Sequence, residues 1–432
     1  MHRPPARSAA VSRQGGPTWP TRNPGYRWVI LAVAFLGIFG AAGLSRFGYS
    51  AVLPDMQKAL ELSGAESGSL ASWNLAGYTL MALVGGFLAS RFGARLVVTT
   101  GMVVTAIGML LTGLSGGLVA ASAARLLTGL GNGVVMAPSV VLMSSWFGTR
   151  QVGLASAIAS SGTGLGLVVA GPVAPRIIES AGADGWRIAW YLFAGVALLM
   201  AIVTLVLERD RPFQASHENK PPAPRRSVRK DLLNVLRSKY AWHLGSIYFL
   251  YGFAYLIYYT FFQKRLTADL GLSTATAGNL FLIAGAASLV FGMLWGAASD
   301  RIGRGRALAL VFAADAVAAC LFAFDPGMAG LVISAVIFGS GVFSVPGLMG
   351  AACGDHFDTK LAYASFGFVT VFIGLGQTVG PYVGGLLEDV FGSLGPSYLL
   401  SAGIFVLAGF TAFLLPDARK QTNPARPGRT PV

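Results

Sequence analysis

The sequence predicts an all-α integral membrane protein with twelve membrane-spanning helices arranged as two six-helix bundles. Of its 432 residues, 54% are hydrophobic and only 12% are charged, whereas soluble domains carry roughly a quarter charged residues. Apolar runs recur along the chain, and each has about the 20 residues that an α-helix needs to cross a bilayer. One long polar linker divides these runs into two sets of six.

The predicted spans follow one another with short loops between them. Those of the first set lie at about 27–50, 68–90, 96–115, 118–146, 152–175 and 187–207. Those of the second set lie at about 241–263, 275–298, 307–325, 328–352, 361–387 and 396–415. The predicted bundles are therefore 26–208 and 240–416. Residues 1–25 contain several Pro and Arg but no apolar core, which predicts a disordered tail and no cleavable signal sequence, and residues 417–432 predict a second tail.

The linker at 209–239 is polar, basic and interrupted by Pro. If the linker and both tails are cytoplasmic, most of the 32 Lys and Arg residues lie on that side. The positive-inside rule then places both termini in the cytoplasm. The same distribution accounts for the net charge of +14, because the basic residues lie between apolar runs and are not interleaved with aromatic residues on a soluble fold. We therefore expect the chain to reside in a lipid bilayer and to bind no nucleic acid.

The two halves repeat each other at an offset of about 210 residues. Arg91 and Gly93 fall on Arg301 and Gly303, in the loops that follow the second and eighth runs, and several helix glycines coincide as well. A parallel duplication of a six-helix unit is the simplest explanation.

These two loops carry related charged stretches, GFLASRFGAR from residue 86 and GAASDRIGRGR from residue 296. The second stretch resembles the signature loop of the major facilitator superfamily in Gly296, Asp300, Arg301, Gly303 and Arg304. The first matches in Gly86, Arg91, Gly93 and Arg95 but has Ser90 where that family usually has Asp. The segment RLLTGLGNG, which includes Arg125, is a further match in the fourth run. The resemblance extends over residues 27–415.

The resemblance implies two pseudo-symmetric bundles around a central cavity, with alternating access by rocking of the halves. It also implies that the signature loops act in gating, through Ser90, Arg91, Arg95, Asp300, Arg301 and Arg304. Their Arg side chains can reach a helix C-terminus or a carboxylate across the cytoplasmic interface. The alternative is that these Arg residues only anchor the loops by the positive-inside effect, which does not require Asp300.

Charged groups within a span usually face a cavity or a partner, because lipid does not solvate them. Arg46, in the first run, is a candidate to bind a carboxylate or another anion, unless it snorkels to the outer interface. In the seventh run, Tyr248, Tyr251, Tyr255 and Tyr258 follow at spacings of 3, 4 and 3 and share one helical face. This stripe predicts a cavity wall with polar tips, although an interfacial aromatic belt also explains Tyr258.

Further polar residues complete the predicted sites. The remaining substrate-site candidates are Tyr49, Asn132, Asn279 and Gln377, of which the amides could equally bridge helices. The proton-coupling candidates are Arg125, Asp315 and His243. Arg125 matches the characteristic Arg of the family's fourth helix, which the resemblance links to coupling or to structural pairing. A structural hydrogen bond for Asp315 and an interfacial position for His243 are the alternatives. Lys264, one turn beyond the tyrosine stripe, is expected to be a solvated loop residue, and attraction of anions at the mouth of the cavity is the alternative.

The basic cavity candidate and the tyrosine stripe favour a proton-coupled symporter for a small organic anion. The segments YTFFQKRLTADLGLS and GLGQTVGP are similar to bacterial monocarboxylate-type members, which implies a multi-pass protein of the bacterial inner membrane. Proton-coupled efflux of a drug or metabolite is the alternative, although the glycine pattern of drug–proton antiporters is broken in the fifth run and complete only in the eleventh. A non-transporting sensor or scaffold would need an added cytoplasmic domain, for which the linker and tails are too short.

Enzyme chemistry is not expected, because the chain shows no metal-binding cluster, nucleophile–base arrangement or phosphate loop. Cys320 and Cys353 lie in apolar segments and are expected to be small buried side chains. We therefore expect no cofactor, and a monomer whose partners are the small-molecule substrate, protons and the bilayer.

Overall fold

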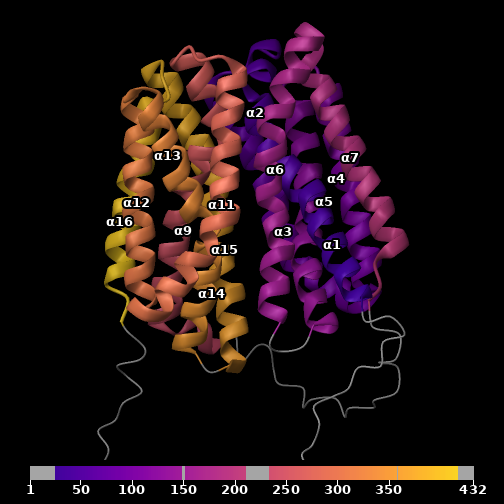
Figure 1. The fold of residues 1–432 in the computed structure, drawn as a ribbon, viewed down its shortest axis with the longest axis vertical. Coiled ribbons are helices and arrows are strands. Elements are labelled where there is room, and N and C mark those ends of the chain that lie inside the picture. The colour runs from indigo at the N-terminus through magenta and orange to yellow at the C-terminus, as the bar shows by residue number, and fades with distance from the viewer. Residues whose placement is uncertain (1–24, 148–150, 211–232, 358, 417–432) are drawn as a thin grey trace, which may run out of the picture.

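The computed structural model describes residues 25–147, 151–210, 233–357 and 359–416. The predicted tails, except for Gly25, and most of the predicted linker lie outside these residues. Within them the chain is almost entirely helical, and two helical bundles stand side by side, the N-terminal one indigo to magenta and the C-terminal one pink to yellow (Figure 1).

The helices follow the predicted order. The N-terminal bundle comprises α1 (Tyr26–Ile38), which continues through a π-helical turn (Phe39–Gly43) into α2 (Leu44–Ala59), then α3 (Gly64–Phe92), α4 (Ala94–Leu114), α5 (Leu118–Trp146), α6 (Val152–Ala181) and α7 (Gly185–Leu207). The C-terminal bundle comprises α9 (Lys239–Thr260), the short α10 (Phe262–Lys264), α11 (Thr274–Ile302), α12 (Arg304–Phe324), α13 (Gly327–Val342), α14 (Val345–His356), α15 (Thr359–Phe391) and α16 (Gly395–Phe413). The span predicted at 328–352 is confirmed as one membrane-spanning segment, Gly327–His356, within which a short turn separates α13 from α14.

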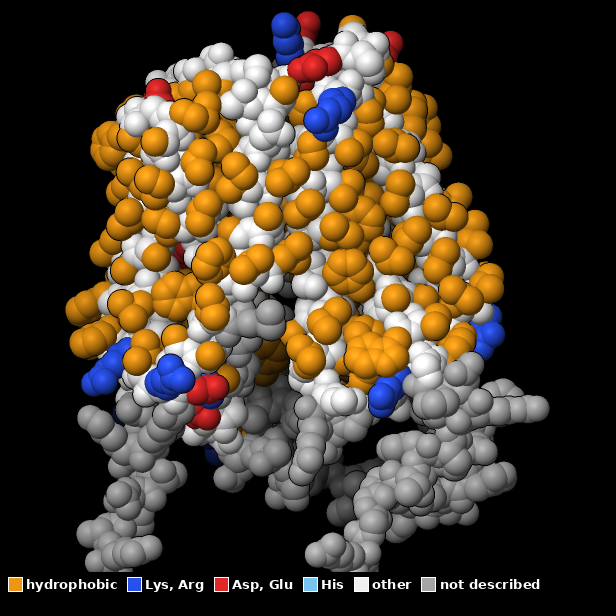
Figure 2. Space-filling model, in the orientation of Figure 1, with side chains coloured by type: hydrophobic (Ala, Val, Ile, Leu, Met, Phe, Trp, Pro, Cys, Tyr) orange, Lys and Arg blue, Asp and Glu red, His pale blue; other side chains and the backbone are white. Residues whose placement is uncertain are grey.

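The number of membrane spans is consistent with the sequence prediction. Among the described residues, 9 helices are long and apolar enough to cross a membrane, or up to 11 if each of two bent pairs is one span. One of these segments, Val152–Leu207, contains both α6 and α7. Counting these two helices separately is consistent with twelve spans. On the face shown in Figure 2, apolar side chains cover the middle of both bundles and the charged side chains lie toward the two ends, as lipid contact requires.

The bundles contact each other at one end, which we call the closed end. There Gly64 of α3 meets Gly385 of α15 so closely that a Cβ on Gly385 would lie 2.0 Å from the Gly64 carbonyl oxygen. Gly171 of α6 meets Gly278 of α11 in the same way, with a Cβ on Gly278 falling 2.3 Å from the Gly171 carbonyl oxygen. Only glycine permits this backbone approach, so these residues determine how tightly the closed end packs.

At the opposite end, which we call the open end, the bundles separate, and a hollow lies between them (Figure 2). The start of α1 and the end of α16 lie at this end (Figure 1), as do the α3–α4 and α11–α12 loops. Each loop turns at a glycine with positive φ, Gly93 at 87° and Gly303 at 93°. Other residues adopt this backbone conformation only with strain, which explains the glycine in both signature stretches.

Candidate substrate site

Arg46 lies on α2, just after the π-helical turn, and its side chain is half-buried. Its guanidinium carbon lies 3.8 Å from the centre of the Tyr78 ring on α3. Its Nε and Nη2 atoms are buried and have no hydrogen-bond partner among the described residues. Buried donors without acceptors are costly, and a carboxylate supplies two acceptor oxygens in the plane of a guanidinium. The local geometry therefore suits an anion.

The C-terminal bundle places two buried polar side chains opposite Arg46. Gln377 of α15 donates from Nε2 to the Tyr255 hydroxyl of α9 at 2.7 Å, while its Oε1 atom has no described partner. Arg46 is close enough for its charge to act on the Tyr255 hydroxyl. Arg46, Tyr78, Tyr255 and Gln377 thus form a polar site between the bundles, which we call the central site.

Aromatic side chains border the central site. Phe47, next to Arg46, makes edge contacts with three rings of the C-terminal bundle: Tyr259 at 5.3 Å, Phe343 at 6.1 Å and Phe281 at 6.4 Å between ring centres. Such edge-to-face contacts are favourable and exclude water. They also offer an apolar surface for the non-charged part of a ligand.

The tyrosine stripe of α9 is buried, and its members have different partners. Tyr248, Tyr251 and Tyr255 stack in succession, with ring centres 6.1 and 4.7 Å apart. Tyr251 donates to the Val342 carbonyl oxygen at the end of α13, and Tyr258 bonds the Ser334 hydroxyl at 2.7 Å. Tyr255 alone in the stripe bonds a central-site residue. Because Tyr258 is fully buried, an interfacial aromatic belt does not describe it.

Arg125 lies in the interior of the N-terminal bundle and is only 1% exposed. Its Nη1 atom donates to the Ser45 carbonyl oxygen at 2.8 Å, and its guanidinium lies over the Tyr49 and Trp190 rings at 4.6 and 5.3 Å. Asn132 donates to the Ser45 hydroxyl at 2.8 Å. Arg125, Tyr49 and Asn132 therefore hold the turn of α2 that carries the central site.

Three other predicted residues make no described contact with the central site. Asn279 is exposed near the start of α11. His243 Nε2 lies 2.8 Å from the Thr411 carbonyl oxygen, near the open end of α9. Asp315 is buried inside the C-terminal bundle.

The signature-loop residues bond within their own bundles. Arg304 forms ion pairs with Asp300 at 2.7 Å and with Asp355 at 3.0 Å. Arg95 donates its backbone N–H to Asp210 at 2.9 Å. Ser90, Arg91 and Arg301 are exposed. These hydrogen bonds and ion pairs of Arg95 and Arg304 therefore lie within one bundle in this conformation.

Glu208 directly follows the last span of the N-terminal bundle and is buried, with no partner for either carboxylate oxygen among the described residues. Burial, and then the nearby Asp210 carboxylate, raise the pKa of Glu208 to about 8, while Arg95 acts in the opposite direction. Glu208 is thus a titratable group beside the first signature loop.

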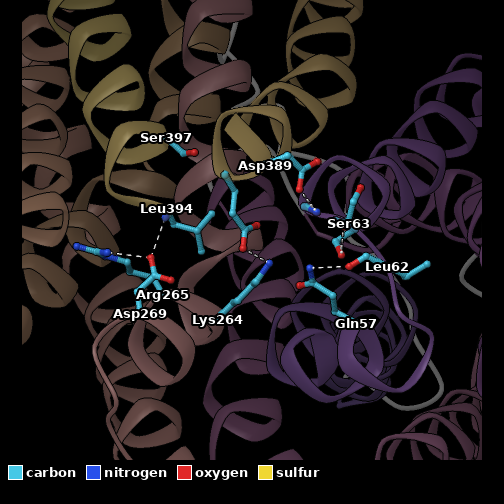
Figure 3. Close-up of polar contacts among 12 residues, drawn as sticks. Gln57, Leu62, Ser63, Lys264, Arg265, Asp269, Asp389, Leu394 and Ser397 are labelled. Atoms are coloured by element: carbon cyan, nitrogen blue, oxygen red, sulfur yellow. Dashed lines mark hydrogen bonds and ion pairs between the residues drawn. The ribbon is translucent and has the colours of Figure 1, made fainter. Parts of the chain in front are cut away.

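The closed end carries charged residues that the sequence analysis did not assign to a site (Figure 3). Lys264 was expected to be solvated, and this is wrong: it is 5% exposed and forms an ion pair with Glu388. Asp389 accepts hydrogen bonds from the backbone N–H groups of Gly64 at 2.5 Å and Ala65 at 2.8 Å, across the two bundles. We call Lys264, Glu388, Asp389 and the start of α3 the closed-end gate.

Comparison with known proteins places this architecture in a family. The model of the family described as "Uncharacterised MFS-type transporter YbfB" matches residues 38–413. The chain belongs to the major facilitator superfamily. It is therefore a membrane transporter and not an enzyme, as the sequence predicted.

Relatives and solved structures agree over most of the chain. The hexuronate transporter of Bacillus subtilis is 25% identical over 398 residues, which cover 88% of this chain and 92% of that protein. Monocarboxylate transporter 11 of Homo sapiens is 27% identical over 455 residues, covering 98% and 88%. A solved bacterial homolog of the human lysosomal transporter Spinster, in an inward-facing and unoccupied conformation, has a TM-score of 0.73 at 16% identity and covers 93% of this chain and 99% of that one.

Proposed function

We propose that this transporter carries a small organic anion of the monocarboxylate type together with protons. The observation that carries the proposal is Arg46, whose guanidinium is stacked on Tyr78 and keeps two buried N–H groups without acceptors. An anionic ligand would supply those acceptors and would bring its own charge to a cation that has no ion-pair partner among the described residues.

The names of the relatives support this substrate class. Hexuronates and monocarboxylates both carry a carboxylate group, and the two relatives named for them match nearly the whole chain. The apolar rings around Phe47 suit the rest of such a molecule, because a pocket usually combines few polar groups with an apolar lining.

Orientation follows from the positive-inside rule. It places the open end, with both termini, at the cytoplasmic face of a bacterial inner membrane. The central site would then be open to the cytoplasm, and the closed-end gate would separate it from the outside. In the alternate state the gate opens and the signature loops, with Asp300, Arg301 and Arg304, approach the opposite bundle.

Uptake by proteoliposomes tests the proposal. An inward proton gradient should drive accumulation of labelled lactate or glucuronate, and Arg46→Gln should abolish it. Lys58→Gln is the matched control, because it removes one positive charge from the exposed end of the same helix and should leave uptake unchanged. Extrusion of cationic dyes without uptake of any carboxylate would instead support the efflux alternative.

A further inference from the structure

Asp315 of α12 is a buried carboxyl group. It has no part in the anion site proposed at Arg46. It is 1% exposed, and neither of its oxygens has a hydrogen-bond partner among the described residues. None of the ion pairs that the described residues form includes it. Burying an isolated carboxylate costs far more than burying the neutral acid. The site therefore suits Asp315 with a proton bound.

The hydroxyl groups around Asp315 are mostly bound to other acceptors. Tyr251, Tyr258 and Tyr259 of α9 all lie close enough for a charge on Asp315 to act on their hydroxyls. Tyr251 donates to the end of α13, and Tyr258 bonds Ser334, which itself donates to a backbone carbonyl of α12. Of these three tyrosines, only Tyr259 has a hydroxyl without a described partner.

No basic group balances Asp315 from the helices packed around it. The range of α13 contains no titratable residue, and that of α16 contains only Tyr398, whose hydroxyl donates to the Tyr258 carbonyl oxygen. Tyr248 and Tyr255 on α9 and Cys320 on α12 lie farther along these helices, and none of the three is basic. The charged groups and histidines of the neighbouring helices gather toward the open end: Lys239 and His243 on α9, Asp300 and Arg301 on α11, Arg304 and Arg306 on α12 itself, and Asp355 and His356 on α14, together with Tyr240 and Cys353.

The carboxyl group lies against the break between α13 and α14. Its Oδ1 atom occupies the space beside Gly341, where an added Cβ would come within 2.8 Å. The last turn of a helix has carbonyl oxygens without intrahelical donors and carries partial negative charge. At the end of α13 the Val342 carbonyl oxygen accepts from Tyr251 and the Gly341 carbonyl oxygen accepts from Ser344, so both oxygens are acceptors and neither is a donor to Asp315. A carboxylate is therefore unfavourable at this position, whereas a carboxylic acid can donate to the second lone pair of one of these oxygens.

The same break reaches the central site. Phe343 lies between α13 and α14, and its ring contacts Phe47, the neighbour of Arg46. Tyr259 contacts Phe47 as well, with ring centres 5.3 Å apart. A change in the break next to Asp315 is thus transmitted by direct ring contacts to the residue beside Arg46.

We propose that Asp315 is the site at which the coupling proton binds, and that its protonation sets the geometry of the α13–α14 break beside the central site. The inference rests on the proposed function, because a coupling proton requires proton-linked transport. With the proton bound, Asp315 donates to the end of α13. When the proton leaves, the negative charge is repelled by that helix end, the Tyr259 hydroxyl, which has no described partner, donates to the carboxylate, and Phe343 shifts against Phe47.

Infrared spectroscopy tests the proton site without any substrate. In liposomes at neutral pH, the difference spectrum of wild type minus Asp315→Asn should contain a carboxylic acid C=O band that shifts in D₂O. The subtraction removes the band of Glu208, whose pKa of about 8 keeps that acid protonated at neutral pH in both proteins. Asparagine has the size of aspartic acid and is neutral, so the variant suits the same space. Asp325→Asn, at an exposed position after the same helix, is the control and should retain the band. If wild type and Asp315→Asn give the same spectrum, the proposal is wrong whatever the substrate is.

Transport measurements test the coupling role. In liposomes loaded with a pH-sensitive dye, addition of lactate should acidify the interior for wild type but not for Asp315→Asn, while exchange of labelled lactate across the membrane continues. Gly341→Ala should have the same effect, because the added methyl group displaces the carboxyl. Proton influx in Asp315→Asn at the wild-type ratio to lactate would overturn the proposal. A wild-type protein that shows the infrared band but transports no carboxylate would refute the proposed function and leave the proton site standing.

Discussion

Replacement of Asp389 by Asn should shift the transporter away from the conformation described above. The Asp389 carboxylate accepts two backbone N–H groups at the start of α3, and it belongs to the opposite bundle. Two attractions therefore depend on its charge: charge-assisted hydrogen bonds and the interaction with the positive end of the α3 dipole. Both are lost when the closed end opens.

The size of the effect follows from these contacts. A negative charge at an exposed helix N-terminus contributes about 0.3–1 kcal/mol, and a hydrogen bond gains roughly 1 kcal/mol when its acceptor is charged instead of neutral. Asn retains one acceptor oxygen, so about 1–2 kcal/mol should be lost, which is a five- to thirtyfold change in an equilibrium. Exposure of Asp389 to solvent favours the lower value.

Distances between the bundles at the closed end measure this equilibrium. Spin labels at Ala183 and Met328, which are exposed and lie on different bundles at that end, should report a larger long-distance population in Asp389→Asn than in the parent. Asp184→Asn is the control, because its ion pair with Arg187 stays within the N-terminal bundle. Identical distance distributions for Asp389→Asn and the parent would show that the contact does not hold the closed end together.

Three further predictions concern other parts of the chain. Because the pKa of Glu208 rises from 4.5 to about 8 on folding, the folded state binds this proton more tightly than the unfolded state does. The contribution to the free energy of unfolding is therefore complete below pH 4.5, and it falls by up to roughly 1.4 kcal/mol per pH unit as the pH rises to about 8. Thermal unfolding should thus depend less on pH in Glu208→Gln, and an unchanged dependence would contradict this. Arg125→Gln should lower the melting temperature in detergent more than Arg46→Gln does, since only Arg125 has its N–H groups bonded to the bundle, and the reverse order would place the structural role at Arg46. Asp300→Asn should impair transport more than Ser90→Ala, whereas the opposite ranking would make the signature loops anchors only.

The sequence predicted those features that depend on a single helix and on the lipid around it. Arg46 was identifiable because a guanidinium in an apolar run must find a partner or a cavity, and Tyr255 because its stripe has helical spacing. Lys264 was not, because its burial depends on Glu388 of α15, which is far away in sequence and which no periodicity connects to it. The break between α13 and α14 also escaped prediction, because both flanking segments are apolar and read as one continuous run. The local signal is Pro346 in the first turn of α14, with glycines on both sides of the turn at Phe343.

The duplication explains why the closed end has two cross-bundle carboxylates and why they differ. At an offset of 210 residues Glu179 corresponds to Asp389 and Thr274 to Gly64, and each carboxylate meets the start of the second helix of the other bundle. Asp389 accepts two backbone N–H groups, whereas Glu179 bonds only the Thr274 hydroxyl in the described structure. Most of the electrostatic stabilisation should therefore come from the Asp389 side. The open end is unequal as well, because Ser90 replaces the acid that Asp300 retains. If the alternate state is held together by these loops, it forms fewer charged contacts between the bundles than the closed end does in the conformation described above. That conformation should therefore predominate without substrate.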